Sequence, residues 1–141
     1  MDGQNDTGYT WEQKIEIYRK AIAMFGIVFD KGDYNVSFHS LSFLHRDISI
    51  MAMRAGDFEL ALENLEKAAE YASELDDLPD VKPHVSLLVN KLEHNSAHNG
   101  KNYSDTSCKM LLKHLPDSVF DGIRNDPRFK AVESSLKDRI E

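Results

Sequence analysis

Histidine and cysteine side chains come nearest, in type and spacing, to a metal site in this sequence. His94 and His98 are four residues apart, a spacing that places two imidazoles on one helix face, and Cys108 and His114 follow. The residues around the two histidines are Asn, Ser and an Asn-Gly pair, which favour a loop over a helix. We therefore expect solvated histidines, a buried cysteine and no metal or other cofactor. A metal-binding or enzymatic helical bundle that uses these four residues is the alternative.

Acidic and hydroxyl side chains do not form the pattern of an active site. Neighbouring acids such as Asp76-Asp77 are more often a solvated helix surface than an acid/base pair. Ser40 directly follows His39, and adjacent residues of a helix point apart. The sequence contains no Gly-x-x-x-x-Gly-Lys loop, no His-Glu-x-x-His and no Gly-x-Ser-x-Gly. We predict that the protein is not an enzyme.

Composition restricts the compartment and the partners. The 141 residues carry 24 Asp and Glu against 17 Lys and Arg, a net charge of −7, which argues against direct binding to nucleic acid. A single cysteine excludes an internal disulfide and favours a reducing compartment. No apolar run approaches the ~18 residues of a membrane-spanning helix. We expect a cytoplasmic protein that does not bind a membrane.

Helical periodicity dominates the first half of the chain. Apolar residues recur at steps of three and four over 11–29, 38–55 and 58–75, which predicts three amphipathic helices. Thr10 and Gln13 form a capping box for the first helix, and Gly32 suits a left-handed exit. Small residues such as Ala61 and Ala68 let a neighbouring helix approach the third one closely.

The second half is less regular. Segment 79–103 is predicted as an irregular connection, with one or two helical turns near Val85–Leu92 and no convincing strand. Helices are expected within 104–115 and 118–124 and from Pro127 onward, where Asp126 is a cap. The fold class is therefore all-α, with about five to seven helices in antiparallel pairs. A single domain is expected over 10–141, with a helical core at 10–78, C-terminal helices at 104–141 and a disordered tail at 1–9.

Two turns share the pattern Gly-Asp-aromatic: Gly32-Asp33-Tyr34 and Gly56-Asp57-Phe58. Glycine permits a left-handed exit, aspartate caps the next helix and the aromatic ring fills the gap between the helices. The second turn opens a longer stretch in which Ala61, Leu65 and Ala68 follow at the spacing of a tetratricopeptide repeat. The stretch resembles that repeat, although the two turns are 24 residues apart instead of about 34. A helix bundle without repeats that uses the same turn is the alternative.

The closing segment adds a second resemblance. Phe120 to Lys130, with Asp-Pro-Arg-Phe at the start of the last helix, is similar to the end of tetratricopeptide-like regions in bacterial regulators. Taken together, residues 9–136 resemble the C-terminal helical region of Firmicutes helix-turn-helix regulators of the xenobiotic-response-element (Cro/repressor-like) family. This chain has no helix-turn-helix segment of its own. The resemblance implies an effector-sensing or dimerisation domain of a bacterial transcriptional regulator, with the DNA-binding domain absent from this chain.

The same resemblance predicts a partner groove. In tetratricopeptide proteins the first helix of each pair lines a concave face. Cations beside apolar side chains on such a face suit an acidic group or a free carboxylate of a peptide. The residues assigned to this groove are Arg19, Lys20, Phe43, Arg46, Ile50, Met53 and Arg54. The expected partner is a protein or peptide, or a second copy of the chain. A free-standing adaptor is the alternative function, and dispersed surface cations are the alternative to the groove.

Overall fold

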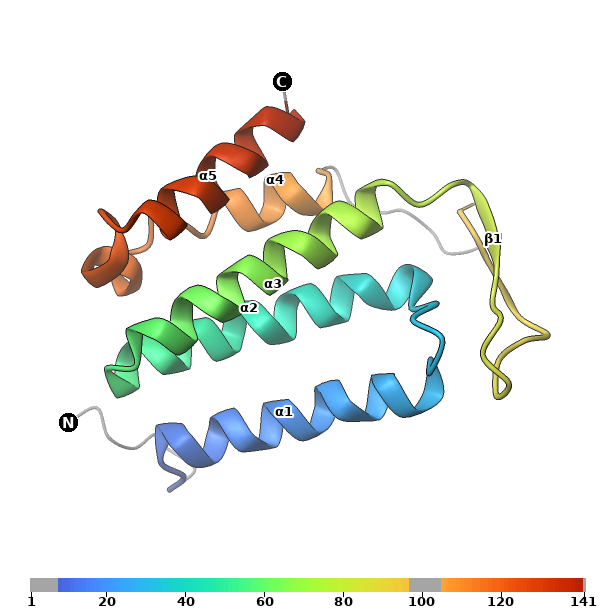
Figure 1. The fold of residues 1–141 in the computed structure, drawn as a ribbon, viewed down its shortest axis with the longest axis horizontal. Helices are drawn as coiled ribbons and strands as arrows, with labels where there is room; N and C mark the ends of the chain where they lie inside the picture. The colour runs from blue at the N-terminus through green and yellow to red at the C-terminus, as the bar shows by residue number, and fades with distance from the viewer. Residues whose placement is uncertain (1–7, 97–104, 141) are drawn as a thin grey trace.

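The structure, a computed structural model, describes residues 8–96 and 105–140 and is mostly helical, with one short two-stranded hairpin (Figure 1). This confirms the all-α fold class. None of the helices in these two ranges is both long and apolar enough to cross a membrane. The elements in chain order are α1 (Trp11–Val28), η1 (Asn35–Ser37), α2 (Phe38–Ala55), α3 (Phe58–Asp76), β1 (Val81–Pro83), β2 (Glu93–Asn95), α4 (Ser107–Leu112), η2 (Ser118–Ile123) and α5 (Pro127–Ile140), where η marks a 3-10 helix.

The α2–α3 hairpin is the centre of the molecule (Figure 1). α1 packs along α2 at one edge, whereas α4, η2 and α5 pack against the hairpin on the other side. The apolar residues of α2, α3 and the C-terminal helices form one buried core. α1 adds one buried side chain to it, Ile15.

Small side chains let α2 and α3 approach closely. Ala61, Ala68 and Ala72 have no exposed surface, as the sequence pattern predicts for Ala61 and Ala68. The approach is close enough for serine hydroxyls on α2 to bond the backbone of α3. Ser42 Oγ donates to Ala68 O at 2.8 Å, and Ser49 Oγ donates to Ala61 O at 2.7 Å.

Helix ends follow the predicted caps. Thr10 and Gln13 form the reciprocal capping box of α1. Gly56 ends α2 in the left-handed conformation at φ 81°, and Asp57 accepts the Leu60 N–H at 3.1 Å. α5 begins at Pro127, as the sequence predicts.

The connection after α3 differs from the prediction. β1 and β2 pair antiparallel with Lys82 opposite His94, and residues 86–91 between them form turns instead of a helix. Periodicity missed the strands because each has three residues, too few for an alternating pattern. The predicted tail 1–9 lies mostly outside the described residues, as does the stretch 97–104.

Candidate interaction groove

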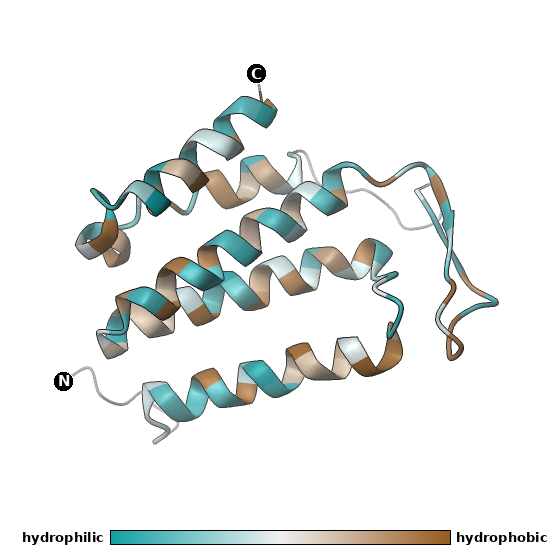
Figure 2. Cartoon of the chain, viewed as in Figure 1, coloured by the Kyte–Doolittle hydropathy of each residue, from teal (hydrophilic) through white to brown (hydrophobic). Residues whose placement is uncertain are grey.

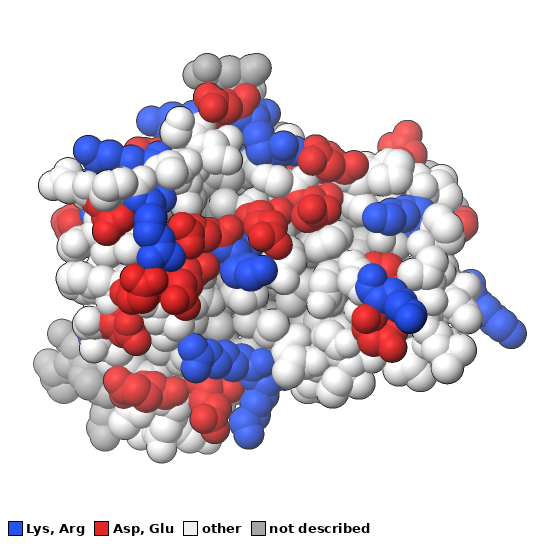
Figure 3. Space-filling view, viewed as in Figure 1, with Lys and Arg blue, Asp and Glu red and all other residues white. Residues whose placement is uncertain are grey.

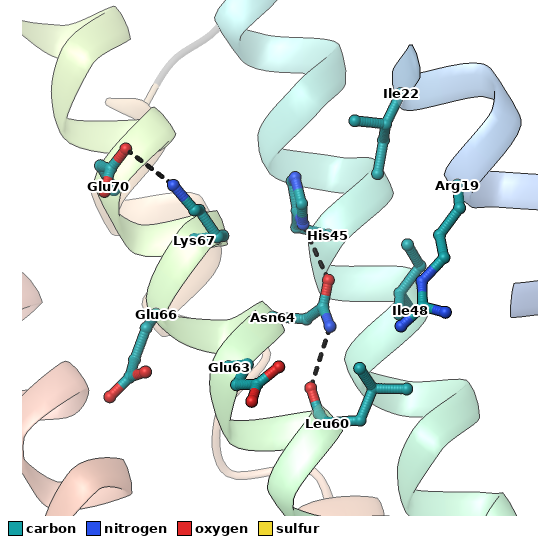
Figure 4. A pocket seen from close by; sticks show the side chains of 10 residues that line it. All are labelled: Arg19, Ile22, His45, Ile48, Leu60, Glu63, Asn64, Glu66, Lys67 and Glu70. Atoms are coloured by element: carbon teal, nitrogen blue, oxygen red, sulfur yellow. Dashed lines mark hydrogen bonds and ion pairs between the residues drawn. The ribbon is translucent and has the colours of Figure 1, made fainter.

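A groove of about 560 Å³ runs between α1 and α3, with α2 as its floor (Figure 4). This size lies within the roughly 300–1,000 Å³ that is usual for ligand pockets. The side chains that line it come from three helices and combine apolar, neutral polar and charged types. They are Arg19, Ile22, His45, Ile48, Leu60, Glu63, Asn64, Glu66, Lys67 and Glu70.

A short hydrogen-bond chain organises the floor of the groove. Burial lowers the pKa of His45, so the imidazole is neutral at pH 7. His45 Nδ1 lies 2.8 Å from Asn64 Oδ1, and Asn64 Nδ2 donates to Leu60 O at 2.9 Å. Because the amide oxygen is the acceptor, the imidazole N–H is on Nδ1 and Nε2 is its acceptor nitrogen. The floor therefore combines apolar side chains with one fixed polar pair.

The two walls of the groove carry different charges. Arg19 projects into the groove from α1, and Glu63 projects from α3 (Figure 4). Lys67 Nζ lies 3.5 Å from a Glu70 oxygen. Figure 3 shows the acidic side chains of α3 as a row across this face. An occupant of the groove thus meets a guanidinium on one side and mainly carboxylates on the other.

Glu66, at the outer rim, is already neutralised. Arg128 of α5 donates to both Glu66 oxygens, at 2.7 and 3.0 Å, and to Glu59 at 2.6 Å. The hydrogen bonds from Arg128 lower the pKa of Glu66 despite its partial burial. Because Glu66 is paired with Arg128, the carboxylate on the α3 wall that we assign to an occupant of the groove is that of Glu63.

The structure separates the residues of the predicted groove. Arg46 donates to Asp47 at 2.8 and 3.0 Å, stacks on Phe43 and lies 3.1 Å from His114 Nε2. Its side chain is 16% exposed. Arg46 therefore faces the C-terminal helices and is paired within the chain.

Arg54 lies on another side of α2, where its guanidinium stacks over the ring of Trp11 in α1 at 5.6 Å. Eight residues of an α-helix are two turns plus about 80°, so Arg46 and Arg54 do not share one line along the helix. Ile50 and Met53 pack against the buried core instead of forming an open floor. The predicted two-arginine face is therefore divided between neighbours.

The α1 cations have two different positions. Lys20 is exposed and lies 3.9 Å from Glu16. Arg19 is the one residue of the predicted set among the side chains that line the α1–α3 groove.

Two other residues of this groove, His45 and Lys67, were not identified from the sequence, because their positions depend on the packing of three helices. Asn64 had a signal in the sequence, because it is a neutral polar residue among the apolar positions of α3. The structure shows that it is buried, at 8% exposure.

The candidate metal ligands are spread over different elements. His94 is buried on β2, Cys108 is buried on α4, and His114 lies beside Arg46. Residue 98 lies outside the described residues. Within the described ranges, no group of three His, Cys, Asp or Glu side chains is placed to hold a metal ion.

A buried polar cluster links the α1–α2 loop to the β1–β2 hairpin. Asp33 accepts from His84 Nδ1 at 3.0 Å, from the N–H groups of Val85 and Ser86 at 2.8 and 3.1 Å, and from Ser86 Oγ. The order differs from that of a nucleophilic triad, because the serine donates to the aspartate and not to the imidazole. Ser86 also has no exposed surface. The cluster therefore fastens the hairpin to the loop.

The α1–α3 groove is the feature of this fold best suited to a partner, because it is open, apolar at its floor and charged at its walls. Its suitability rests on the geometry and chemistry of the lining residues. Comparison with protein-family models, with curated proteins and with solved structures finds no match for this chain.

Proposed function

We propose that this chain is a non-enzymatic interaction module that binds a segment of a protein or peptide in the α1–α3 groove. The observation that supports it is the composition of the groove, in which α1, α2 and α3 each contribute one apolar residue (Ile22, Ile48 and Leu60) and the two walls carry opposite charges. An amphipathic helical segment suits such a groove, since its apolar residues recur every three or four positions. The segment would place an acidic side chain against Arg19 and a basic one against Glu63.

The wider role follows from the sequence resemblance. On this proposal the module is the effector-sensing or dimerisation region of a bacterial transcriptional regulator, and the groove receives the signal-bearing segment. A free-standing adaptor would use the groove in the same way. In both roles the groove requires the same chemistry of its occupant, which is an apolar stripe flanked by charges of both signs.

The experiment is selection of binders from a displayed library of helical peptides, followed by NMR titration of the labelled protein. We expect peptides with apolar residues at i, i+3, i+4 and i+7, and chemical-shift changes at Ile22, Asn64 and Leu60. Arg19→Glu weakens peptides that carry an acid on the α1 side by about tenfold or more, the value of one charge-assisted hydrogen bond. A matching acid-to-lysine change in the peptide restores the affinity.

Two variants provide the control. Lys137→Glu changes a charge on α5, away from the groove, and leaves the affinity unchanged. Arg46→Glu with Arg54→Glu tests the face predicted from sequence. If this double variant abolishes binding while Arg19→Glu has no effect, the partner does not use the α1–α3 groove and the proposal is wrong.

A further inference from the structure

Exposed apolar side chains are concentrated at one side of the molecule. In the described residues, twelve large apolar side chains are exposed, and ten of them lie on α1, just before it, in η1 or in the β1–β2 hairpin. Figure 2 shows hydrophobic residues, in brown, at the C-terminal end of α1 and at the hairpin tip. The ten are Tyr9, Ile17, Met24, Ile27, Val36, Val81, Val85, Leu87, Leu88 and Leu92.

α1 carries an apolar stripe on each of two faces. The inner stripe packs on α2 and includes Ile15 and Ile22. The outer stripe runs through Ile17, Ala21, Met24 and Val28, at steps of four, three and four, which is the spacing of a helix that pairs with another helix. Ile17 and Met24 are 46% and 66% exposed. The outer face of α1, a helix at the edge of the fold, is therefore apolar, although a polar face would be expected where a helix faces solvent.

The hairpin extends this face and is held to the α1–α2 loop by buried contacts. The Asp33 cluster anchors Val85 and Ser86, Lys31 N–H donates to Ser86 Oγ at 2.9 Å, and His84 stacks on Phe29 with ring centroids 5.2 Å apart. The turn beyond this anchor presents Leu87 and Leu88, which are 80% and 70% exposed. Buried polar groups thus fix a turn whose apolar side chains contribute nothing to the core.

The size of this face is close to that of a protein interface. Its six most exposed side chains are 61–80% accessible and together expose roughly 700 Å². The largest apolar patch of a typical monomer is about 300–600 Å², whereas a standard interface buries about 800 Å² on each partner. These six are Met24, Ile27, Val85, Leu87, Leu88 and Leu92.

Charge indicates which partner this face accepts. Exposed side chains of both signs surround it: Asp30, Lys31, Asp80, Lys82, Lys91 and Glu93 at the hairpin end, and Glu12, Glu16 and Lys20 beside Ile17. Away from the axis of a two-fold interface, residue i of one copy contacts residue j of the other and j contacts i, so a rim with both signs is able to pair with itself. An anionic bilayer would favour cations alone. The acidic row on α3, which would repel a second copy, lies on a different part of the surface (Figure 3).

We propose that the face formed by the outer stripe of α1 and the β1–β2 hairpin tip docks onto the same face of a second copy, giving a two-fold homodimer. The dimer does not depend on the α1–α3 groove, because Arg19 and Ile22 line that groove whereas Ile17 lines a separate hollow with Lys20. Each copy keeps its groove in the dimer.

Sedimentation equilibrium of the full chain tests the proposal. We expect the wild type to have twice the monomer mass of 16.1 kDa at micromolar concentration. Met24→Glu with Leu88→Glu places charges inside the interface and raises the dimer Kd by about 100-fold or more. Ile140→Glu is the matched control, since Ile140 is an exposed apolar side chain at the end of α5, and it leaves the Kd unchanged.

A distance measurement keeps the test valid if the glutamate variant folds poorly. Cys108 is buried, so Met24→Cys offers one accessible thiol for a nitroxide label. Pulsed electron paramagnetic resonance then gives a shorter distance between copies for a label at position 24 than for one at position 140. A wild type that stays monomeric, a dimer that tolerates both glutamates, or a monomer that binds phosphatidylglycerol vesicles through this face would each overturn the proposal.

Discussion

The two Gly-Asp-aromatic turns have the same residue types and different structures. Gly32 and Gly56 both adopt the left-handed conformation, at φ 76° and 81°. Asp57 then caps α3 through Leu60 N–H, and the helix starts at the next residue. Asp33 caps nothing. It is 6% exposed and accepts four hydrogen bonds from residues more than fifty positions away.

This difference shows what a local motif determines. Glycine at φ near 80° follows from the absence of a Cβ and is the same in both turns. The role of the aspartate depends on which N–H groups lie nearest, and at Asp33 these belong to the hairpin. Asn35, two residues after Asp33, has φ 52° and adds a further bond to the hairpin: its Nδ2–H donates to Lys82 O at 3.2 Å. α2 therefore begins only after η1.

Asp33→Ala is expected to have the largest effect. It removes the acceptor of four buried hydrogen bonds, so the free energy of opening the hairpin falls by about 3 kcal/mol. Hydrogen exchange at the Val85 and Ser86 amides measures the loss. Asp57→Ala is the matched control, because it removes an aspartate from the equivalent turn without touching the hairpin. Unchanged protection of both amides in Asp33→Ala would show that the cluster does not hold the hairpin.

Acid is expected to release the same hairpin. Burial on its own raises the pKa of Asp33, but the hydrogen bonds from Ser86, Val85 and His84 outweigh it and hold this pKa well below the usual 3.8. The stabilisation is therefore complete above the unfolded-state value and is lost as pH falls below about 4, by an amount on the order of 2 kcal/mol. Amide protection in the hairpin then declines between pH 5 and about 2 in the wild type. The same decline in Asp33→Ala would assign it to another carboxylate.

Gly32→Val and Gly56→Val test the feature that the two turns share. Both force a β-branched side chain to positive φ, and each is expected to cost more than about 1 kcal/mol of unfolding free energy. No neighbouring atom would contact an added Cβ at either position, so the cost is conformational and not steric. Urea denaturation measures both. A loss at one position only would mean that the two glycines do not have equivalent conformations.

Asp57→Ala is expected to have the smallest effect, about 1 kcal/mol, which is the usual value of one helix N-cap. Asp57→Asn keeps a capping oxygen and restores most of the loss. The measurement is the urea midpoint at constant slope. A loss as large as that of Asp33→Ala would remove the distinction between a local cap and a long-range anchor.

Much of the fold was predictable because it depends on local sequence. The three long helices, the Thr10–Gln13 box, the left-handed glycines and the start of α5 at Pro127 follow from periodicity and capping chemistry. The close packing at Ala61 and Ala68 was also visible, because small residues recur on one face of α3. The helices, caps and glycine conformations involve contacts within a few residues along the chain. The packing at Ala61 and Ala68 joins α3 to α2, and the sequence indicated only which face of α3 permits it.

The candidate site depended on tertiary structure. Periodicity places Phe43, Arg46 and Arg54 on α2 but does not state which neighbour covers each face. α1 receives Arg54 and the C-terminal helices receive Arg46, so the predicted groove is divided. The α1–α3 groove draws on three helices, and its one predicted residue is Arg19.

The sequence by itself determined where helices begin, end and turn left-handed, because capping and φ preference act within one turn of chain. Only the tertiary structure decided what Asp33 binds, which face of α2 is covered and where α1 stays apolar and exposed. The reason is physical. A buried carboxylate needs donors wherever the fold supplies them, and these came from His84, Val85 and Ser86, on a hairpin too short to leave a pattern in the sequence.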